Sequence, residues 1–230
     1  MHSKTLSTFH KAIYEQLNGD VLALSWKWQI VTELFESKEK VELLNQTASS
    51  FFLACQMTFT DDVLLALSRI TDFPRSVGQD NLVITRLLEE LEQTQHPTFH
   101  AELSKLIGAA MQACNPFKQH KHKKLAHNDL NIKLKQTNEP LPGIMVGDVN
   151  RAVKSLQAIM NAFSRYFFNS ETQFEVEKSG GVEALMIYLR KAVDTFEQEK
   201  QAMSETLGLT NGSPQDTAGL AKNARQADPD

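Results

Sequence analysis

The residues best suited to chemistry lie together in a basic segment that runs from Lys118 to Lys135. This segment holds six lysines and one acidic residue, Asp129, so its formal charge is +5. A histidine among ammonium groups can exchange a proton near neutral pH, while the lysines attract a polyanion. This combination suits metal-independent cleavage of RNA, in which an imidazole moves a proton and a cation stabilises charge on the phosphorane. Three of the chain's seven histidines lie in this segment: His120, His122 and His127.

Two other interpretations of the segment stand beside the catalytic one, a solvated helix face and a metal site. A charged run on a helix is usually a solvated face, although helical periodicity would place His120, Lys123, Lys124 and His127 on one side. Metal binding is disfavoured, because two histidines that are two residues apart point away from each other on a helix. No cysteine or cluster of carboxylates completes a ligand set there. We therefore expect no metal and no cofactor.

The composition describes an ordinary soluble globular protein in which the basic segment is the exception. The 230 residues include 24 Lys+Arg and 28 Asp+Glu, a net charge of −4, so the chain outside the segment carries −9. An acidic body excludes general coating of nucleic acid but permits one basic site. No apolar run approaches the ~18 residues of a membrane span, and no secretory signal is visible. Cys55 and Cys114 lie in apolar helical patterns, so we expect reduced core cysteines in a cytoplasmic protein.

The elements that must position the segment are predicted to be helices, and the fold class is all-α. Leu, Ala, Glu and Lys dominate between the breaks, and no alternating run is long enough for a core strand. We expect breaks or new helix starts near Gly19, Thr60, Asp80 and Pro116, the last either kinking a helix or beginning a new one. A single domain is predicted over residues 1–205 and a disordered tail over 206–230. The predicted helices occupy about 5–35, 38–55, 60–71, 80–91, 99–114, 148–168 and 181–204.

Residues 121–129 resemble a known catalytic motif. The run Lys-His-Lys-Lys-Leu-Ala-His-Asn-Asp resembles the motif of the HEPN superfamily, which is an Arg, a polar residue, a few further residues and a His. It is most similar to the abortive-infection U-type (AbiU-like) family, whose version resembles Arg-Asn-Lys-x-x-Ala-His. The segments 41–45, 61–72 and 80–82 support the match, and the resemblance extends over roughly residues 20–205.

This resemblance implies both a fold and an activity. The fold would be a HEPN-like helical bundle of about six or seven helices with long antiparallel helices. Two copies would form a homodimer whose motifs meet at a cleft, and the activity would be metal-independent cleavage of RNA. By the same resemblance, His127 takes the position of the family His and is the proton-transfer group. His122 takes the polar position, and Lys121 takes the position of the Arg.

The Lys at position 121 departs from the family pattern and leaves two functions open. Arg offers a planar fork that matches phosphate, whereas Lys offers a single mobile charge. One hypothesis is a ribonuclease of bacterial phage defence or of a toxin–antitoxin pair, with RNA and an antitoxin or defence protein as partners. The alternative is a degenerate HEPN domain that binds nucleic acid, nucleotide or protein. The residues expected to contact nucleic acid are Lys118, His120, Lys123, Lys124 and Asn128.

Overall fold

The computed structural model describes residues 6–76, 78–89, 91, 95–120, 143–175 and 181–207. Contacts within the chain divide it into two units, residues 1–184 and residues 185–230, which we treat one at a time. The described part is almost entirely helical, apart from two strands of two residues each. The prediction of an all-α fold is therefore confirmed. The extents of the single domain and of the tail remain predictions, and residues 208–230 lie outside the described part.

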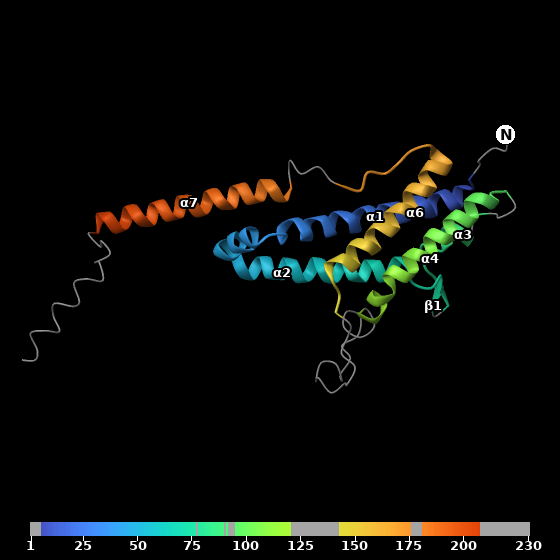
Figure 1. Cartoon of the computed structure of the whole chain (residues 1–230), viewed down its shortest axis with the longest axis horizontal. Helices are drawn as coiled ribbons and strands as arrows, with labels where there is room; N and C mark the ends of the chain where they lie inside the picture. Colours follow the sequence, from blue (N-terminus) through green and yellow to red (C-terminus); the bar gives the residue numbers. More distant parts are fainter. Residues whose placement is uncertain are drawn as a thin grey trace, which may run out of the picture. The chain divides into compact units, whose positions relative to one another are not determined.

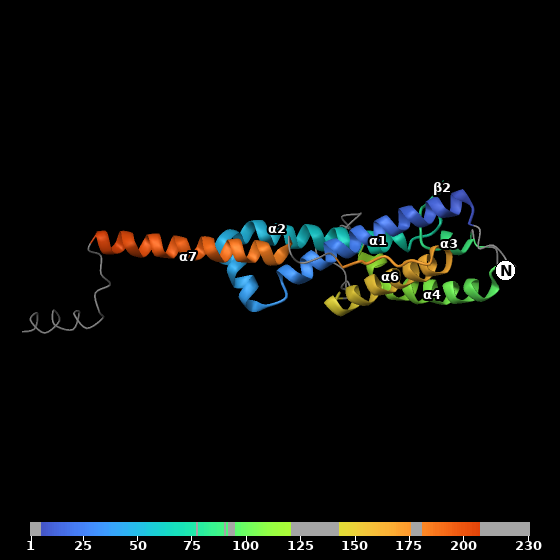
Figure 2. The same ribbon diagram turned by 90° about the horizontal axis from the view of Figure 1, so that it is seen from above.

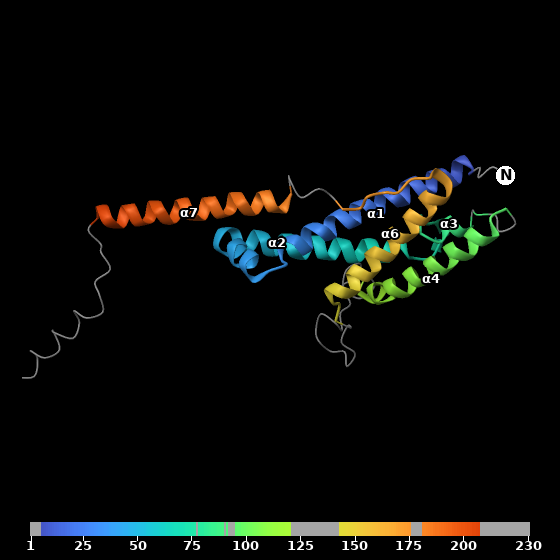
Figure 3. The same ribbon diagram turned by 45° about the horizontal axis from the view of Figure 1, so that its top comes forward.

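The described part of the first unit is built from four long helices in two antiparallel pairs. Helices α1 (Thr8–Leu34) and α2 (Lys38–Ile70) run in opposite directions, as do α4 (Pro97–His120) and α6 (Val146–Phe168) (Figure 1). Seen from above, the α1–α2 pair and the α4–α6 pair lie next to each other (Figure 2). Helix α6 packs against both α4 and α1 and lies between them (Figure 3). The expected long antiparallel helices are therefore present.

The core lies where the apolar faces of these four helices meet. Phe163 of α6 is fully buried, and its ring stacks on Tyr14 of α1 with the centroids 4.9 Å apart. The same ring meets His10 of α1 in an edge-to-face contact at 5.2 Å, the geometry that aromatic quadrupoles favour. This cluster therefore fastens α6 to the first turns of α1. Other side chains with no exposed surface include Leu17, Val21, Val63, Leu67, Leu103, Phe117, Leu156 and Ile159.

The helices begin at residues that cap them. The side-chain oxygen of Ser7 accepts a hydrogen bond from N of His10 (3.0 Å), and that of Ser37 accepts one from N of Lys40 (3.3 Å). Each serine thus satisfies a backbone donor that the first turn leaves unpaired. At the start of α6, the N of Met145 donates to Oδ2 of Asp148 (3.2 Å). The predicted start after Ser37 is confirmed.

Two of the expected helix breaks are wrong. Helix α1 continues through Gly19, and α2 continues through Thr60, although both positions carry local signals for a new helix. A glycine inside a helix costs only about 1 kcal/mol, less than the burial of Leu17 and Val21 on either side of it contributes. Helix α2 is instead irregular at Ala48, whose φ of −150° and ψ of 64° are not helical.

The expected helix start at Asp80 is wrong, and of the two alternatives for Pro116 the start of a new helix is wrong. Asp80 caps no helix: it lies in β2 (Gln79–Asp80), which pairs with β1 (Arg75–Ser76), and only the short α3 (Arg86–Glu89) follows. Its carboxylate accepts hydrogen bonds from Arg86 (2.7 Å) and Arg75 (3.0 Å), which hold the pKa of Asp80 below its usual range. Pro116 lies inside a continuous α4, neither ending nor restarting it. The fully buried Phe117 beside it keeps this last turn packed on the core.

By length and composition alone, one described helix, α2, is long and apolar enough to cross a membrane. Its second half carries Asp61 and Asp62, and the Asp62 carboxylate forms a hydrogen-bonded ion pair with Lys27 of α1 (2.5 Å). Val63 and Leu67 of the same half are fully buried in the bundle. This half of α2 is therefore a core helix of the first unit.

The second unit contains most of α7 (Val182–Thr206), a helix of 25 residues. Its length and position agree with the expected helix over 181–204. After its end, N of Leu207 donates one further backbone hydrogen bond to O of Met203 (3.0 Å).

Truncation of the aromatic cluster gives a direct test of this core. We expect Phe163→Ala to lower the free energy of unfolding by about 3–5 kcal/mol, because it leaves a cavity at a fully buried site. Phe9→Ala is the matched control, since Phe9 on α1 is 64% exposed, and it should change stability by no more than about 0.5 kcal/mol. Urea unfolding followed by circular dichroism measures both. Equal losses for the two variants would contradict this description of the core.

Candidate functional site

The carboxyl end of α4 carries the first lysine and the first histidine of the basic segment. Lys118 and His120 lie in its last turn, and both side chains are half-buried. The carbonyl groups at the end of a helix carry partial negative charge, which favours cations at this place. Two of the residues expected to contact nucleic acid are therefore located at one defined end of the bundle.

The remaining predicted site residues lie outside the described part of the chain. The structure assigns them no distance, exposure or partner, so their roles remain predictions. They are the proposed catalytic residues Lys121, His122 and His127, and the proposed contact residues Lys123, Lys124 and Asn128.

The end of α4 lies beside the end of α2, where the family-like segment 61–72 finishes. The ammonium group of Lys118 lies 5.7 Å from the centre of the Phe73 ring, within the range of a cation–π contact. One turn earlier on α4, the thiol of Cys114 is hydrogen-bonded with Thr71. The Phe73 ring is 70% exposed, so one of its faces is open to solvent. The fold thus brings an exposed aromatic ring next to the start of the basic segment.

Burial determines the chemistry of Cys114. Removal from water raises the pKa of its thiol to about 12, against the smaller lowering effects of the Thr71 hydrogen bond and the Lys118 charge. Cys114 is fully buried, which confirms it as a core residue, whereas Cys55 is only half-buried. The expectation that both cysteines belong to the core is correct for Cys114 alone. Both thiols are free.

Arg69 lies in the last turn of α2 and Asp72 lies just after it, three positions along the chain, a spacing that allows either an ion pair or a helix-end contact. The structure shows a helix-end contact, since Oδ1 of Asp72 accepts a hydrogen bond from N of Phe73 (2.9 Å). Arg69 is exposed and lines a cavity of about 310 Å³ together with Asp20 and Lys27 of α1. Asp72 therefore helps to set the direction in which the chain reaches Phe73.

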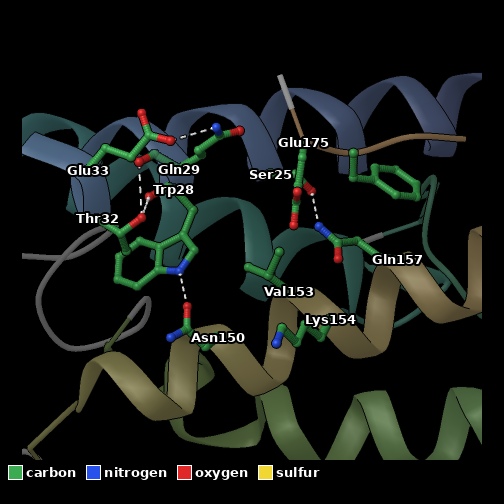
Figure 4. Close-up of a pocket in the computed structure, with 11 residues that line it drawn as sticks. Ser25, Trp28, Gln29, Thr32, Glu33, Asn150, Val153, Lys154, Gln157 and Glu175 are labelled. Atoms are coloured by element: carbon green, nitrogen blue, oxygen red, sulfur yellow. Dashed lines mark hydrogen bonds between the residues drawn. The ribbon is translucent and has the colours of Figure 1, made fainter. Parts of the chain in front are cut away.

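A polar groove lies between α1 and α6 (Figure 4). Its volume is about 270 Å³, and hydrogen bonds across it join the two helices. The indole Nε1 of Trp28 donates to Oδ1 of Asn150 (2.6 Å), and Nε2 of Gln157 donates to Oγ of Ser25 (2.9 Å). These side chains therefore satisfy one another, and the groove serves to hold α6 in register on α1. Its other lining residues are Gln29, Thr32, Glu33, Val153, Lys154, Phe174 and Glu175.

A second, more apolar cavity of about 610 Å³ adjoins this groove at the amino end of α6. It shares Trp28, Thr32 and Asn150 with the groove and is also lined by Ile144 and Met145. Sequence reasoning missed both cavities. Trp28 and Asn150 are 122 residues apart, and no local pattern in one sequence indicates that they meet.

Metal binding finds no support in the part of the chain that the structure describes. Within it, no group of three or more His, Cys, Asp or Glu side chains is arranged to hold an ion. His122 and His127 lie outside that part, so the expectation of no metal at the basic segment remains a prediction.

Comparison with models of protein families shows which family the chain belongs to. The model of the HEPN family AbiU2 matches residues 9–176, well over half of the chain. The chain belongs to the AbiU2 HEPN family. The match runs from the first turn of α1 through the whole of α6, and it includes both the basic segment and Phe73. Helix α7 lies beyond it. Comparison with curated proteins and with solved structures found no match.

The two cysteines should differ in reactivity if the end of α4 is packed as described. We expect a maleimide at neutral pH to modify Cys55 in the folded AbiU2-family protein and to leave Cys114 unmodified. Burial and a pKa of about 12 keep the Cys114 thiol protonated and out of reach. Mass spectrometry of the digested protein locates the label, and both thiols should react in urea. Rapid labelling of Cys114 in the folded protein would contradict the packing.

Proposed function

We propose that this AbiU2-family protein is a metal-independent endoribonuclease of a bacterial phage-defence or toxin–antitoxin system. It is a HEPN-type abortive-infection protein by family. The observation that carries the finer proposal is the junction at the end of α4, where Lys118 lies 5.7 Å from an exposed Phe73 ring and the basic segment begins. A cation beside an exposed aromatic ring can bind single-stranded RNA by charge and by base stacking.

The proposed reaction needs a proton-transfer group and a cation on the phosphate. His127 acts as the general acid or base for the 2′-hydroxyl or the leaving oxygen, and Lys121 contacts the phosphate whose charge grows in the transition state. His122 occupies the polar position between them in the motif. Lys123 and Lys124, with Lys118, His120 and Asn128, attract and hold the RNA chain. No metal and no cofactor takes part.

Further parts of the proposal concern assembly and place of action. Two copies form a homodimer in which the motifs meet at one cleft, and an antitoxin or another defence protein controls it. The protein acts in the cytoplasm on RNA. The resemblance of residues 121–129 to the HEPN motif supports these statements.

A second candidate function rests on Lys121. Because a lysine cannot reproduce the bidentate contact of an arginine with phosphate, the domain would bind nucleic acid, nucleotide or protein without cutting RNA. The two candidate functions predict different effects of an arginine at position 121 on RNA cleavage.

Cleavage of RNA in the presence of a chelator tests the catalytic proposal. We expect the unchanged protein to cut single-stranded RNA in EDTA and His127→Ala to lose at least about 100-fold in rate, because general acid–base catalysis contributes about that much. His100→Ala is the matched control, since His100 lies on α4 outside the motif, and it should cut at the original rate. Gel electrophoresis of labelled RNA gives the rates. Equal cleavage by the unchanged protein and His127→Ala would refute the role of His127.

The variant Lys121→Arg separates the two candidate functions. Under the catalytic proposal, Lys121→Arg cuts RNA faster than the unchanged protein, because the planar guanidinium holds the phosphate in two places. RNA that is bound with unchanged affinity but cut by neither protein would favour the binding module.

The contribution of the α4 junction is measured by binding. We expect Phe73→Ala to weaken single-stranded RNA binding about 5- to 150-fold, since stacking is worth about 1–3 kcal/mol per base. Lys118→Ala should instead reduce the dependence of affinity on salt, because one phosphate contact is lost. Fluorescence anisotropy of labelled RNA at several salt concentrations measures both, with Phe9→Ala as the exposed-phenylalanine control. An unchanged affinity of Phe73→Ala for RNA would show that the Phe73 ring does not contact the RNA.

A further inference from the structure

Helix α7 carries an apolar stripe with the spacing of a coiled coil. Apolar residues recur at alternating intervals of four and three positions, which is the heptad pattern of two helices that wrap around each other. One lysine, Lys200, interrupts the stripe. Lys200 and Leu207 occupy the heptad position called a. The complete stripe is Val182, Met186, Leu189, Val193, Phe196, Lys200, Met203 and Leu207.

The stripe is most exposed where it continues along the second unit. Phe196, Met203 and Leu207 are each 65% exposed, while Leu189 and Val193 are half-buried. Val182 and Met186, at the amino end of α7, are buried, so the layers available to a partner are those of Leu189, Val193, Phe196 and Lys200. A helix that shows large apolar side chains at regular spacing to water is stabilised by a partner that covers them.

We propose that α7 forms an antiparallel two-stranded coiled coil with α7 of a second copy of this chain. This contact lies outside the family match, and it does not depend on ribonuclease activity. Two-fold symmetry then requires every contact to occur twice. The central layers pair Val193 of one copy with Phe196 of the other, and Leu189 with Lys200.

Lys200 disfavours the parallel arrangement. In a parallel pair, position a of one helix faces position a of the other, so the two copies of Lys200 would meet in the core. In the antiparallel pair Lys200 faces Leu189, whose side chain can pack on the lysine stem while the ammonium group stays in water. The lysine thus selects direction at a moderate cost in stability.

Charges beside the stripe select the register. With Val193 opposite Phe196, the flanking position of Arg190 lies next to Glu197 of the other copy, which gives two symmetric ion pairs. A shift of the register by one heptad in one direction would place Glu197 of one copy next to Glu197 of the other. A shift in the opposite direction would place the two copies of Arg190 next to each other. Arg190 has no ion-pair partner in the described part of the chain, and Glu197 has only a long contact of 3.9 Å with the exposed Lys200. Both charges are therefore available for this contact.

Distances between spin labels test the direction of the pair in the full chain. Labels are attached at Lys191→Cys or Glu205→Cys, which point away from the stripe, in a Cys55→Ser background in which Cys114 is buried. In the antiparallel pair, the two 205 labels are offset by about 30 Å along the axis and the two 191 labels by about 10 Å, at 1.5 Å per residue. The 205 distance is therefore expected to be the longer. Double electron–electron resonance measures both.

Charge reversal tests the register with the same readout. Arg190→Glu alone, or Glu197→Arg alone, places like charges opposite each other twice, and the distance between the 205 labels should be lost. The double variant Arg190→Glu/Glu197→Arg restores opposite charges and should restore the distance. Lys191→Glu is the matched control, since it reverses a charge on the outward face and should leave the distance unchanged.

Three outcomes would overturn the proposal. Equal distances at positions 191 and 205 would show a parallel pair. A double variant that loses the distance as the two single variants do would show that Arg190 and Glu197 of the two copies do not contact each other. The absence of any defined distance between copies, in protein that is folded by circular dichroism, would assign the stripe to a contact within the chain or to a different protein.

Discussion

The packing of α6 against both α1 and α4 is the interaction on which the rest of the first unit depends. Phe163 is fully buried at one end of this contact, stacked on Tyr14, and the bond from Trp28 to Asn150 holds the other end. Because α4 and α6 are antiparallel neighbours, the carboxyl end of α4 and the amino end of α6 lie at the same end of the pair. These are the two points between which the basic segment is attached. The core therefore determines where the proposed active site is anchored.

The same packing explains which parts of the fold could be predicted from the sequence. Helix starts at Ser37 and ends near Ile70 follow from local capping and from the proline that comes after, so they were predictable. The expected interruptions at Gly19 and Thr60, and the expected start of a new helix at Pro116, were wrong because each is a local preference of about 1–3 kcal/mol. The buried side chains on either side of each position contribute more than that, and this contribution exists only in the folded bundle. Local signals thus located the long helices but overestimated their number of breaks, and they predicted a helix over 80–91 where only the short α3 forms.

In the candidate site, too, some features follow from local sequence and others only from contacts between distant residues. Charge, histidines and motif spacing are local, so the basic segment and the family were recognisable from residues 118–129. The approach of Phe73 to Lys118 and the groove between α1 and α6 depend on residues that are 45 and 122 positions apart, and no periodicity within one helix predicts them. The acidic net charge of −4 conceals a basic site because the positive charges gather at one end of α4 and beyond it.

The central claim is that His127 assists the 2′-hydroxyl of RNA in cutting its own backbone. The most direct measurement compares an RNA with the same strand carrying a single 2′-deoxy substitution at the cleaved position, in EDTA, with unchanged protein and with His127→Ala. We predict that the unchanged protein cuts the RNA but spares the deoxy position, and that His127→Ala cuts neither strand. Cleavage at the deoxy position, or cleavage that survives removal of His127, would contradict the claim.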